Sequence, residues 1–267
     1  MVRPRLDAVL FDLDGTLVNT GPLILTSFAM TVEEILGVSL PPETYLGGVG
    51  IPLRAQLERL VLANYRGDIL KAFGGEEMHR NGRAGTVGEA REKGTISLET
   101  ASRLEEVATE MAAAYQRNNA IVHDDLIAPY DGVREVLEHF EALGLAMAVV
   151  TSKRRGPAIG DLAHFDLDGF FPVLIGADDV EIHKPDPYPL RFALSRLEER
   201  AGKPMPAATA AYVGDSPYDM VASQAAGTHT VGAGWGMFGL EALVALSPDD
   251  LFTEPPQMAV LGSDLQE

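Results

Sequence analysis

The sequence predicts an α/β fold, in which helices cover both faces of a parallel sheet and an all-helical domain is inserted after the first strand. Two observations support this prediction. Short apolar runs that end in polar loops alternate with stretches of helical periodicity along most of the chain. Residues 19–128 interrupt that alternation, because they have helical periodicity and no convincing strand. An interruption of this length is too long for a single crossover connection and indicates a separate domain.

Four apolar runs have the length and composition of buried strands, and each leads into a polar loop. They are residues 6–11, 145–150, 172–175 and 210–213. Apolar residues recur at helical spacing between them, in residues 132–143, 187–199 and 217–226. Because strand and helix alternate, a parallel sheet is the economical arrangement, and we assign residues 1–18 and 129–267 to one core domain.

Residues 19–128 are predicted to form the inserted helical domain. Its candidate helices are residues 22–36, 52–64 and 98–117. Glycines recur among charged residues in the stretch 66–94, which predicts a mobile loop or a pair of short helices. At the other end of the chain, the tail after Ser247 contains several prolines and is predicted to extend no helix.

The charge of the chain limits the partners that it can bind. It has 21 basic and 39 acidic side chains among 267 residues, and a formal net charge of −18. Long-range repulsion therefore argues against nucleic acids and anionic membranes as partners. The same repulsion would act on a phosphate ester. A small phosphorylated metabolite as substrate would therefore require local cations and a divalent metal at its site.

Cysteine is absent from the sequence, which excludes disulfides, thiolate metal sites and cysteine nucleophiles. No segment has the roughly 18 uninterrupted apolar residues of a membrane-spanning helix, and the N-terminal stretch lacks the apolar core of a secretion signal. We therefore expect a cytoplasmic protein, as a monomer or a homodimer.

Polar residues that follow the first apolar run form the first candidate site. Asp12 and Asp14 are two residues apart, so in extended backbone they project on the same side. Gly15 allows a tight turn and a close approach of a ligand to the main chain. Paired carboxylates suit a nucleophile and a general acid–base. A loop that only caps the next helix, or an incomplete calcium loop, would show the same pattern.

Two more candidate sites follow later strands. Thr151 and Ser152 begin a hydroxyl-rich turn, where backbone N–H groups of the next helix could hold phosphate oxygens. A simple N-cap is the alternative interpretation. Lys184 stands before Pro185 and Pro187, which could fix the direction of its ammonium group. A solvated surface lysine is the ordinary alternative there.

The fourth candidate site follows the strand at residues 210–213. Asp215 is an oxygen ligand of the kind that Mg²⁺ prefers, and Asp219 lies one turn further on the same helix face. Either carboxylate could instead be present because acidic residues are favoured near helix N-termini. Ligands of open parallel sheets bind at the carboxyl ends of the strands, so all four candidate sites are expected to converge.

The four segments together resemble the signature motifs of the haloacid dehalogenase superfamily, in the order found there. They are DLDGTL at residues 12–17, VTSK at 150–153, KPDP at 184–187 and GDSPYD at 214–219. The continuations YDGV at 130–133, AAGT at 225–228 and WG at 235–236 resemble the phosphoglycolate phosphatase-like branch. The resemblance implies a Rossmann-like core, and it implies that residues 19–128 are a helical cap domain.

The resemblance also implies a reaction. Asp12 would attack phosphorus to form an aspartyl-phosphate, and Asp14 would protonate the leaving group and then activate water. Mg²⁺ would be held by the Asp12 carboxylate, the Asp14 main-chain carbonyl and Asp215. Thr151 and Lys184 would neutralise the phosphoryl oxygens.

The same resemblance assigns supporting roles. Asp219 would orient Lys184 or metal-bound waters without touching the substrate. Gly15, Thr16 and Ser152 would contact the substrate, and Arg54 of the cap is a candidate for binding its carboxylate or sugar, with a solvated helix arginine as the alternative.

Hydrolysis of a small phosphomonoester such as phosphoglycolate is the leading functional hypothesis. An inorganic pyrophosphatase is a rival, because relatives with an HDD-like turn, here residues 123–125, include pyrophosphatases. A phosphosugar mutase resembling β-phosphoglucomutase would use the same aspartyl-phosphate. A non-catalytic binding protein ranks last, since every expected reactive side chain is present. His123 could bind a metal or belong to a hinge, and Trp235 fits a structural plug.

Overall fold

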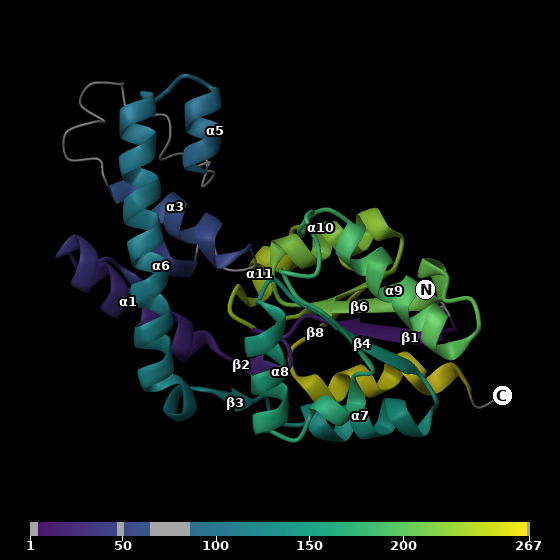
Figure 1. The fold of residues 1–267 in the computed structure, drawn as a ribbon. Helices are drawn as coiled ribbons and strands as arrows, with labels where there is room; N and C mark the ends of the chain where they lie inside the picture. Colours follow the sequence, from purple (N-terminus) through teal and green to yellow (C-terminus); the bar gives the residue numbers. More distant parts are fainter. Residues whose placement is uncertain (1–4, 47–50, 65–85, 266–267) are drawn as a thin grey trace. The chain divides into compact units, whose positions relative to one another are not determined.

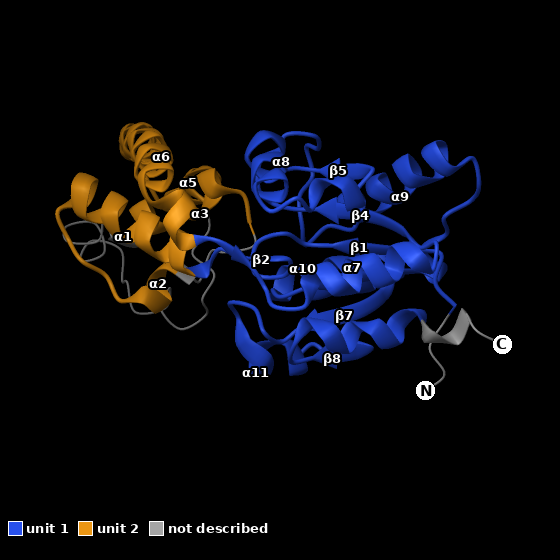
Figure 2. Cartoon of the chain, turned by 90° about the horizontal axis from the view of Figure 1, so that it is seen from below, with its two compact units in different colours: residues 1–21, 127–267 blue, residues 22–126 orange. Residues whose placement is uncertain are grey.

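The computed structural model describes residues 5–46, 51–64 and 86–265, and the chain divides into two compact units. Unit 1 comprises Met1–Gly21 and Ile127–Glu267, and unit 2 comprises Pro22–Leu126 (Figure 2). The boundaries expected from the sequence were after residues 18 and 128. Unit 2 is therefore inserted between the two chain segments that make up unit 1.

Unit 1 is built on a six-stranded sheet in which every neighbouring pair of strands is parallel (Figure 1). The strand order is β5-β4-β1-β6-β7-β8. The strands are β1 (Ala8–Phe11), β4 (Ala146–Val150), β5 (Val173–Ile175), β6 (Ala210–Gly214), β7 (His229–Ala233) and β8 (Asp250–Phe252). The predicted parallel α/β fold is confirmed, and the four predicted strands are β1, β4, β5 and β6.

The central strand β1 is buried on both faces, as its uninterrupted apolar sequence predicts. Leu10 belongs to a core cluster that packs against α9 (Tyr188–Ala201) and α10 (Pro217–Ala226). The ring of Phe11 lies on the other face, 6.3 Å from the ring of Phe140 in α7 (Val133–Ala142). Successive side chains of β1 thus pack against opposite helical layers, and this holds the strand between them.

Two strands of this sheet and two helices of this unit were not predicted from the sequence. Strands β7 and β8 have few apolar residues, and β8 has three residues in all. Glycines in α8 (Arg155–His164) obscure its helical pattern, and α11 (Gly239–Val244) is short. The tail was predicted to extend no helix. It instead forms a 3₁₀ helix, η3 (Pro255–Leu265), that packs against α7. Prolines are tolerated there because they occupy the first turn.

Unit 2 consists of helices around a separate apolar core. They are α1 (Gly21–Leu36), α2 (Pro42–Leu46), α3 (Leu53–Asn64), α5 (Val87–Glu92) and α6 (Leu98–Leu126). Residues 66–85 of the glycine-rich stretch lie outside the described residues. Its remaining part contains α5, and Thr86 is the N-cap of that helix. Helix α6 continues beyond the predicted end at residue 117, so His123 lies in its last turn, close to the point where the chain returns to unit 1.

The two chain segments that lead into and out of unit 2 pair with each other in unit 1. Strand β2 (Val18–Asn19) and strand β3 (Ala128–Pro129) form a two-stranded antiparallel sheet, with Val18 opposite Pro129. Each strand has only two residues, so pattern analysis could not detect them. Within the described ranges, no helix combines the length and the apolarity needed to cross a membrane.

Candidate active site

The register of the three central strands brings the candidate residues to one edge of the sheet. Phe11, the last residue of β1, lies opposite Val149 of β4 and Val213 of β6. The chain continues from these positions to Asp12, and to Thr151 and Asp215 after the neighbouring strands. The sheet order reverses at β1, where an open α/β sheet has its ligand-binding crevice.

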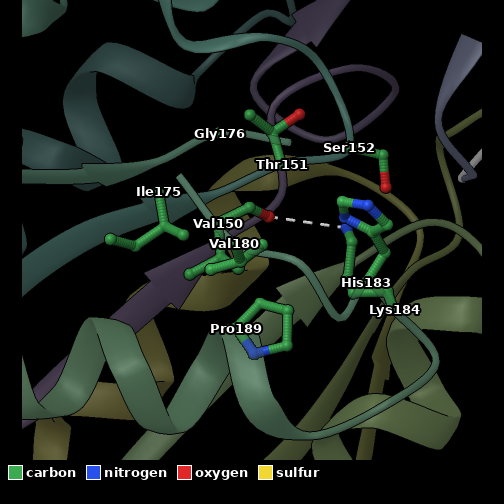
Figure 3. A pocket seen from close by; sticks show the side chains of 9 residues that line it. All are labelled: Val150, Thr151, Ser152, Ile175, Gly176, Val180, His183, Lys184 and Pro189. Atoms are coloured by element: carbon green, nitrogen blue, oxygen red, sulfur yellow. Dashed lines mark hydrogen bonds between the residues drawn. The ribbon is translucent and has the colours of Figure 1, made fainter. Parts of the chain in front are cut away.

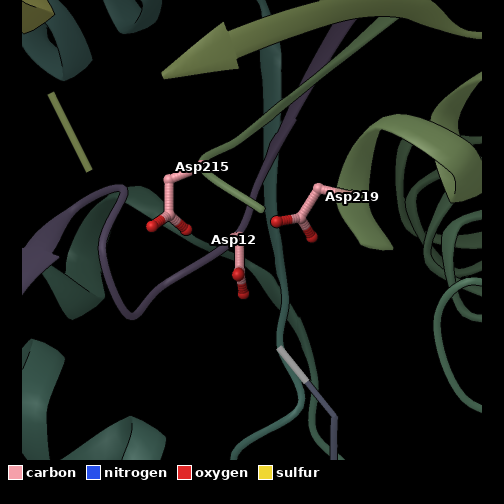
Figure 4. Close-up of side chains that lie close together, drawn as sticks. All are labelled: Asp12, Asp215 and Asp219. Atoms are coloured by element: carbon pink, nitrogen blue, oxygen red, sulfur yellow. The ribbon is translucent and has the colours of Figure 1, made fainter. Parts of the chain in front are cut away.

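Three aspartates form a buried cluster at this edge (Figure 4). Asp12, Asp215 and Asp219 each contribute a carboxylate oxygen, and these oxygens all lie within 4.8 Å of one another. All three residues are at most 5% exposed. Among the residues that the structure describes, this is the one group of three or more metal-ligating side chains.

Lys184 provides a positive charge in direct contact with the aspartate cluster. Its Nζ lies 3.2 Å from Asp12 Oδ1 and 2.6 Å from Asp219 Oδ1, and it donates to the Tyr212 hydroxyl at 2.9 Å. Burial alone would lower the pKa of Lys184, but Asp12 and Asp219 outweigh burial, so the pKa rises and the ammonium stays charged. One ammonium group therefore balances part of the charge of three carboxylates.

Both oxygens of Asp219 are occupied by protein donors. Oδ1 accepts from Lys184 and from the Tyr212 hydroxyl, the latter at 2.9 Å. Oδ2 accepts from the Ser216 backbone N–H at 3.0 Å and from its hydroxyl at 2.6 Å, because Ser216 and Asp219 form the capping box of α10. Asp219 therefore supports Lys184 and the loop, as its predicted supporting role requires.

Asp12 and Asp215 each keep one carboxylate oxygen that accepts no hydrogen bond from the described residues. Asp12 Oδ1 accepts from the Leu13 N–H at 2.8 Å, and Asp215 Oδ2 accepts from the Met237 N–H at 2.8 Å. Within the described part of the chain, the other oxygen of each carboxylate accepts no hydrogen bond. These two oxygens are available to a ligand.

The electrostatics of the cluster indicate excess negative charge. The pKa of Asp12 is raised to about 7, mainly by burial; the charges of Asp219 and Asp14 contribute to the rise, and Lys184 opposes it. Burial, followed by the charges of Asp219 and Asp12, raises the pKa of Asp215 well above its ordinary value. Carboxyl groups with such raised pKa values are stabilised as anions by a nearby cation. The cluster thus has the donor set and the charge that fit a divalent metal ion.

Two glycines leave the space that Asp215 occupies. Gly15 has a φ of +83°, and a Cβ atom on it would lie 2.2 Å from Asp215 Oδ2. A Cβ atom on Gly236 would lie 2.2 Å from Asp215 Cβ. Gly15 was predicted to contact the substrate, and the structure gives it this close contact with Asp215. Gly236 was given no role at the site from the sequence, because its closeness to Asp215 arises only in the folded chain.

Asp14 is held by a lysine to which the sequence analysis assigned no role. Lys153 Nζ lies 3.0 Å from Asp14 Oδ1 and 2.5 Å from Asp161 Oδ2. Burial lowers the pKa of Lys153, but Asp14 and Asp161 raise it more, so the pKa lies above its ordinary value. The VTSK segment contains this lysine, but its partner in α8 could not be read from any local pattern.

Thr151 and Ser152 lie beside Lys184 at a small pocket (Figure 3). The Thr151 hydroxyl accepts from the Lys153 backbone N–H at 3.1 Å, and Lys184 Nζ lies 3.4 Å from the Val150 carbonyl oxygen. The pocket is lined by Val150, Thr151, Ser152, Ile175, Gly176, Val180, His183, Lys184 and Pro189. The pocket thus joins the hydroxyl-bearing turn after β4 to Lys184, and Lys184 in turn contacts Asp12.

Two residues expected to contact the substrate have other partners. The Thr16 side chain is fully buried, its hydroxyl has no hydrogen-bond partner among the described residues, and its carbonyl oxygen accepts from Trp235 Nε1 at 3.0 Å. Trp235 is thereby tied to the loop that follows β1. Arg54 donates to Glu58 at 2.9 Å, to the Thr109 hydroxyl at 2.7 Å and to a backbone carbonyl of α6 at 3.1 Å. Arg54 therefore joins α3 to α6 within unit 2.

His123, the other candidate metal ligand, lies in unit 2. Its Nδ1 is 2.8 Å from Asp124 Oδ1, and the Asp124 side chain is 78% exposed. His123 belongs to no cluster of three metal-ligating groups in the described ranges. The aspartate cluster of unit 1 is therefore the stronger metal site.

Comparison with known proteins identifies relatives along the whole chain. The family model described as haloacid dehalogenase-like hydrolase matches residues 9–73 and 67–233. A relative from Caldanaerobacter subterraneus subsp. tengcongensis, which carries the pyrophosphatase name PpaX, is 34% identical over 92% of this chain and 89% of its own. The pyrophosphatase PpaX of Bacillus cereus (strain Q1) is 31% identical over 98% of both chains.

Solved structures show the same fold at lower identity. A predicted phosphoglycolate phosphatase from Haemophilus somnus 129PT superimposes with a TM-score of 0.73 and 21% identity, over 96% of this chain and 97% of that one. The haloacid dehalogenase-like family protein SP0104 from Streptococcus pneumoniae superimposes with a TM-score of 0.66 and 19% identity, over 96% and 97%. These similarities establish the architecture of the chain.

Proposed function

The chain belongs to the haloacid dehalogenase-like hydrolase family and is a phosphatase, and on that basis we propose that it hydrolyses a small phosphate compound through an aspartyl-phosphate on Asp12. One observation supports this proposal above the others. Asp12 is buried at the end of the central strand, with Lys184 at 3.2 Å from one oxygen and its other oxygen free of protein donors in the described chain.

The first chemical step uses Asp12 as nucleophile. A carboxylate oxygen of Asp12 attacks phosphorus, the bond to the leaving oxygen breaks, and Asp14 delivers a proton to that oxygen. Lys184 favours the ionised, nucleophilic form of Asp12 through its positive charge. In the second step a water molecule attacks the aspartyl-phosphate, Asp14 accepts its proton, and inorganic phosphate leaves.

The remaining polar groups stabilise the transferred phosphoryl group. Lys184 and the hydroxyls of Thr151 and Ser152 lie together at the pocket, where they can receive its oxygens. Asp219 keeps the Lys184 ammonium in place and needs no contact with the substrate. Mg²⁺ would be held by Asp12, Asp215 and the main-chain carbonyl of Asp14, and when bound it supplies the charge that draws an anionic substrate to an anionic nucleophile.

Binding of Mg²⁺ is expected to stabilise the fold even when no substrate is present. The cation relieves repulsion between buried carboxylates, and a ligand at 100 times its Kd contributes about 2.7 kcal/mol to the free energy of unfolding. The melting temperature should therefore rise by several degrees on addition of MgCl₂ and fall again with EDTA. Asp215→Asn should remove most of that rise, whereas Asp249→Asn, at an exposed position, should keep it. An equal rise in all three proteins would contradict this metal site.

The substrate is proposed to be inorganic pyrophosphate first and phosphoglycolate second. Curated relatives that are 31–34% identical over more than nine-tenths of the chain carry pyrophosphatase names. Phosphoglycolate appears in the names of structures that share only 19–22% identity, which supports the fold more than the substrate. A phosphosugar mutase remains the third candidate, because it would use the same aspartyl-phosphate.

Purified protein should be tested with Mg²⁺ against pyrophosphate, phosphoglycolate and β-glucose 1-phosphate in parallel. We expect kcat/KM for phosphate release to be at least about tenfold higher with pyrophosphate than with phosphoglycolate, and activity to be lost in EDTA. A higher value for phosphoglycolate would reverse the order of the two substrates. Formation of the sugar 6-phosphate without release of phosphate would instead identify a mutase.

A further inference from the structure

Lys153 joins two carboxylates that come from different parts of unit 1. Its Nζ lies 3.0 Å from Asp14 Oδ1 and 2.5 Å from Asp161 Oδ2. The Asp161 side chain is 2% exposed, and those of Asp14 and Lys153 are 18% and 20% exposed. We propose that Lys153 is a positioning residue, which is anchored by Asp161 and holds Asp14 in the orientation that proton transfer requires. This inference rests on the proposed role of Asp14.

The backbone around Lys153 is fixed on both sides. Its N–H donates to the Thr151 hydroxyl at 3.1 Å, and its carbonyl oxygen accepts from the Ala177 N–H at 2.8 Å. The first contact ties Lys153 to the end of β4, and the second ties it to the loop after β5. Asp161 then fixes the ammonium end from α8. A lysine held at both ends can restrain its partner, whereas a freely moving one cannot.

The rotational freedom of an aspartate side chain explains why Asp14 needs restraint. An aspartate that is free to rotate populates several χ1 rotamers, and only one of them presents the carboxyl group to the leaving oxygen. Misplacement of a reacting group by about 1 Å can lower the rate about 100-fold. Lys153 contacts Oδ1 of Asp14, which leaves Oδ2 as the oxygen to carry the proton.

A direct role in phosphate binding is the alternative for Lys153, and the contacts argue against it. Its ammonium group is already shared between two carboxylates at 2.5 and 3.0 Å, so the trio carries a net negative charge when both are ionised. Lys184 contacts the nucleophile Asp12 instead. Lys153 is therefore assigned the positioning of Asp14, and Lys184 the contact with Asp12 and the phosphoryl group. Experiments can separate these two roles.

Phosphate compounds with different leaving groups distinguish positioning of Asp14 from binding of phosphate. Departure of an alkoxide needs the proton of Asp14, whereas departure of p-nitrophenolate needs it little. Since kcat/KM reports the steps up to the first irreversible one, Lys153→Met should lower it about 10- to 100-fold for an alkyl phosphate and by less than about threefold for p-nitrophenyl phosphate. Lys203→Met, which removes an exposed lysine, is the matched control and should change neither value.

A double-mutant cycle tests whether Lys153 acts through Asp14. In an Asp14→Asn background, Lys153→Met should reduce kcat/KM by less than a further threefold or so, because the group that it positions is gone. If the parent protein hydrolyses only pyrophosphate, leaving groups cannot be compared. The double-mutant cycle measured with pyrophosphate then tests whether Lys153 acts through Asp14. Should Lys153→Met fail to fold because Asp161 loses the ammonium group beside it, Lys153→Met/Asp161→Asn removes both charges and should show the same dependence on the leaving group.

Two results would overturn the inference while leaving the proposed function intact. One is an equal loss of kcat/KM for every leaving group, and the other is a loss that multiplies with that of Asp14→Asn. Either would mean that Lys153 acts on the substrate directly or only stabilises the fold. A parent protein that releases phosphate from none of these compounds would instead overturn the proposed function, and this inference with it.

Discussion

Asp12→Asn is expected to reduce the rate of phosphate release at least about 10⁴-fold while the protein remains folded. The amide cannot attack phosphorus, so no aspartyl-phosphate can form. The carboxylate is also buried among other acidic groups, so its replacement by a neutral side chain of the same shape removes repulsion. Rates should be measured with saturating Mg²⁺ on the best substrate of the parent protein.

The melting temperature separates loss of chemistry from loss of folding in this variant. The pKa of Asp12 is about 7 in the folded protein and 3.8 in an unperturbed group. A carboxyl group with a raised pKa costs the folded state increasing free energy as the pH rises from about 4 to about 7. At pH 8 in EDTA, Asp12→Asn should therefore melt no lower than the parent protein. A variant that keeps more than a tenth of the parent activity would exclude Asp12 as the nucleophile.

A matched control for Asp12→Asn lies at the other end of the same strand. Asp7 precedes β1, and its side chain is 33% exposed and 3.8 Å from Lys203. Asp7→Asn makes the same chemical change at a distance from the aspartate cluster. It should leave the rate of phosphate release within about twofold of that of the parent protein, as surface substitutions usually have small effects.

Lys184→Met is expected to lower both stability and activity. The ammonium group is buried and bridges Asp12 and Asp219, so its removal leaves two carboxylates without their cation. Removing one partner of a buried ion pair typically costs about 3–5 kcal/mol of the free energy of unfolding. For a chain of this size the melting temperature should fall by on the order of 10 °C. The loss of an electrostatic contact to the phosphoryl group should lower kcat about 10²- to 10³-fold.

A second substitution tests the cause of that instability. Asp219→Asn in the Lys184→Met background removes one of the unpaired carboxylates and should recover part of the lost stability without recovering activity. Denaturant unfolding in EDTA measures the first effect, and phosphate release measures the second. Lys203→Met provides the control for loss of a lysine. If Lys184→Met unfolds at the same denaturant concentration as the parent protein, the ion pairs contribute little to the fold.

The parts of the fold that were predicted are those with a strong local signal. Strands β1, β4, β5 and β6 are apolar runs before polar loops, and the alternation of these runs with helices predicted the parallel sheet. Strand β8, with three residues, has no such signal, because its pairing with β7 depends on tertiary structure. Helix α6 extends past its predicted end because polar residues on its exposed side weaken the apolar pattern there.

The candidate site also contains residues that were predicted from the sequence and contacts that were not. Asp12, Thr151 and Asp215 could be placed together from the sequence because each follows a strand, and parallel strands end at one edge. Lys153 and Asp161 could not be paired, since their contact depends on how α8 packs beside the sheet. Tyr212 belongs to β6, and its hydrogen bonds to Lys184 and Asp219 arise from the fold alone. Local patterns therefore identify chemical groups, and packing decides their partners.

The pairing of β2 with β3 means that the inserted helical unit begins and ends at neighbouring points of the core. Val18 lies opposite Pro129 in an antiparallel pair, and such partners have Cα atoms about 4.5–5.5 Å apart. Evolution could therefore exchange, enlarge or remove the insertion without breaking the strands that hold the aspartate cluster.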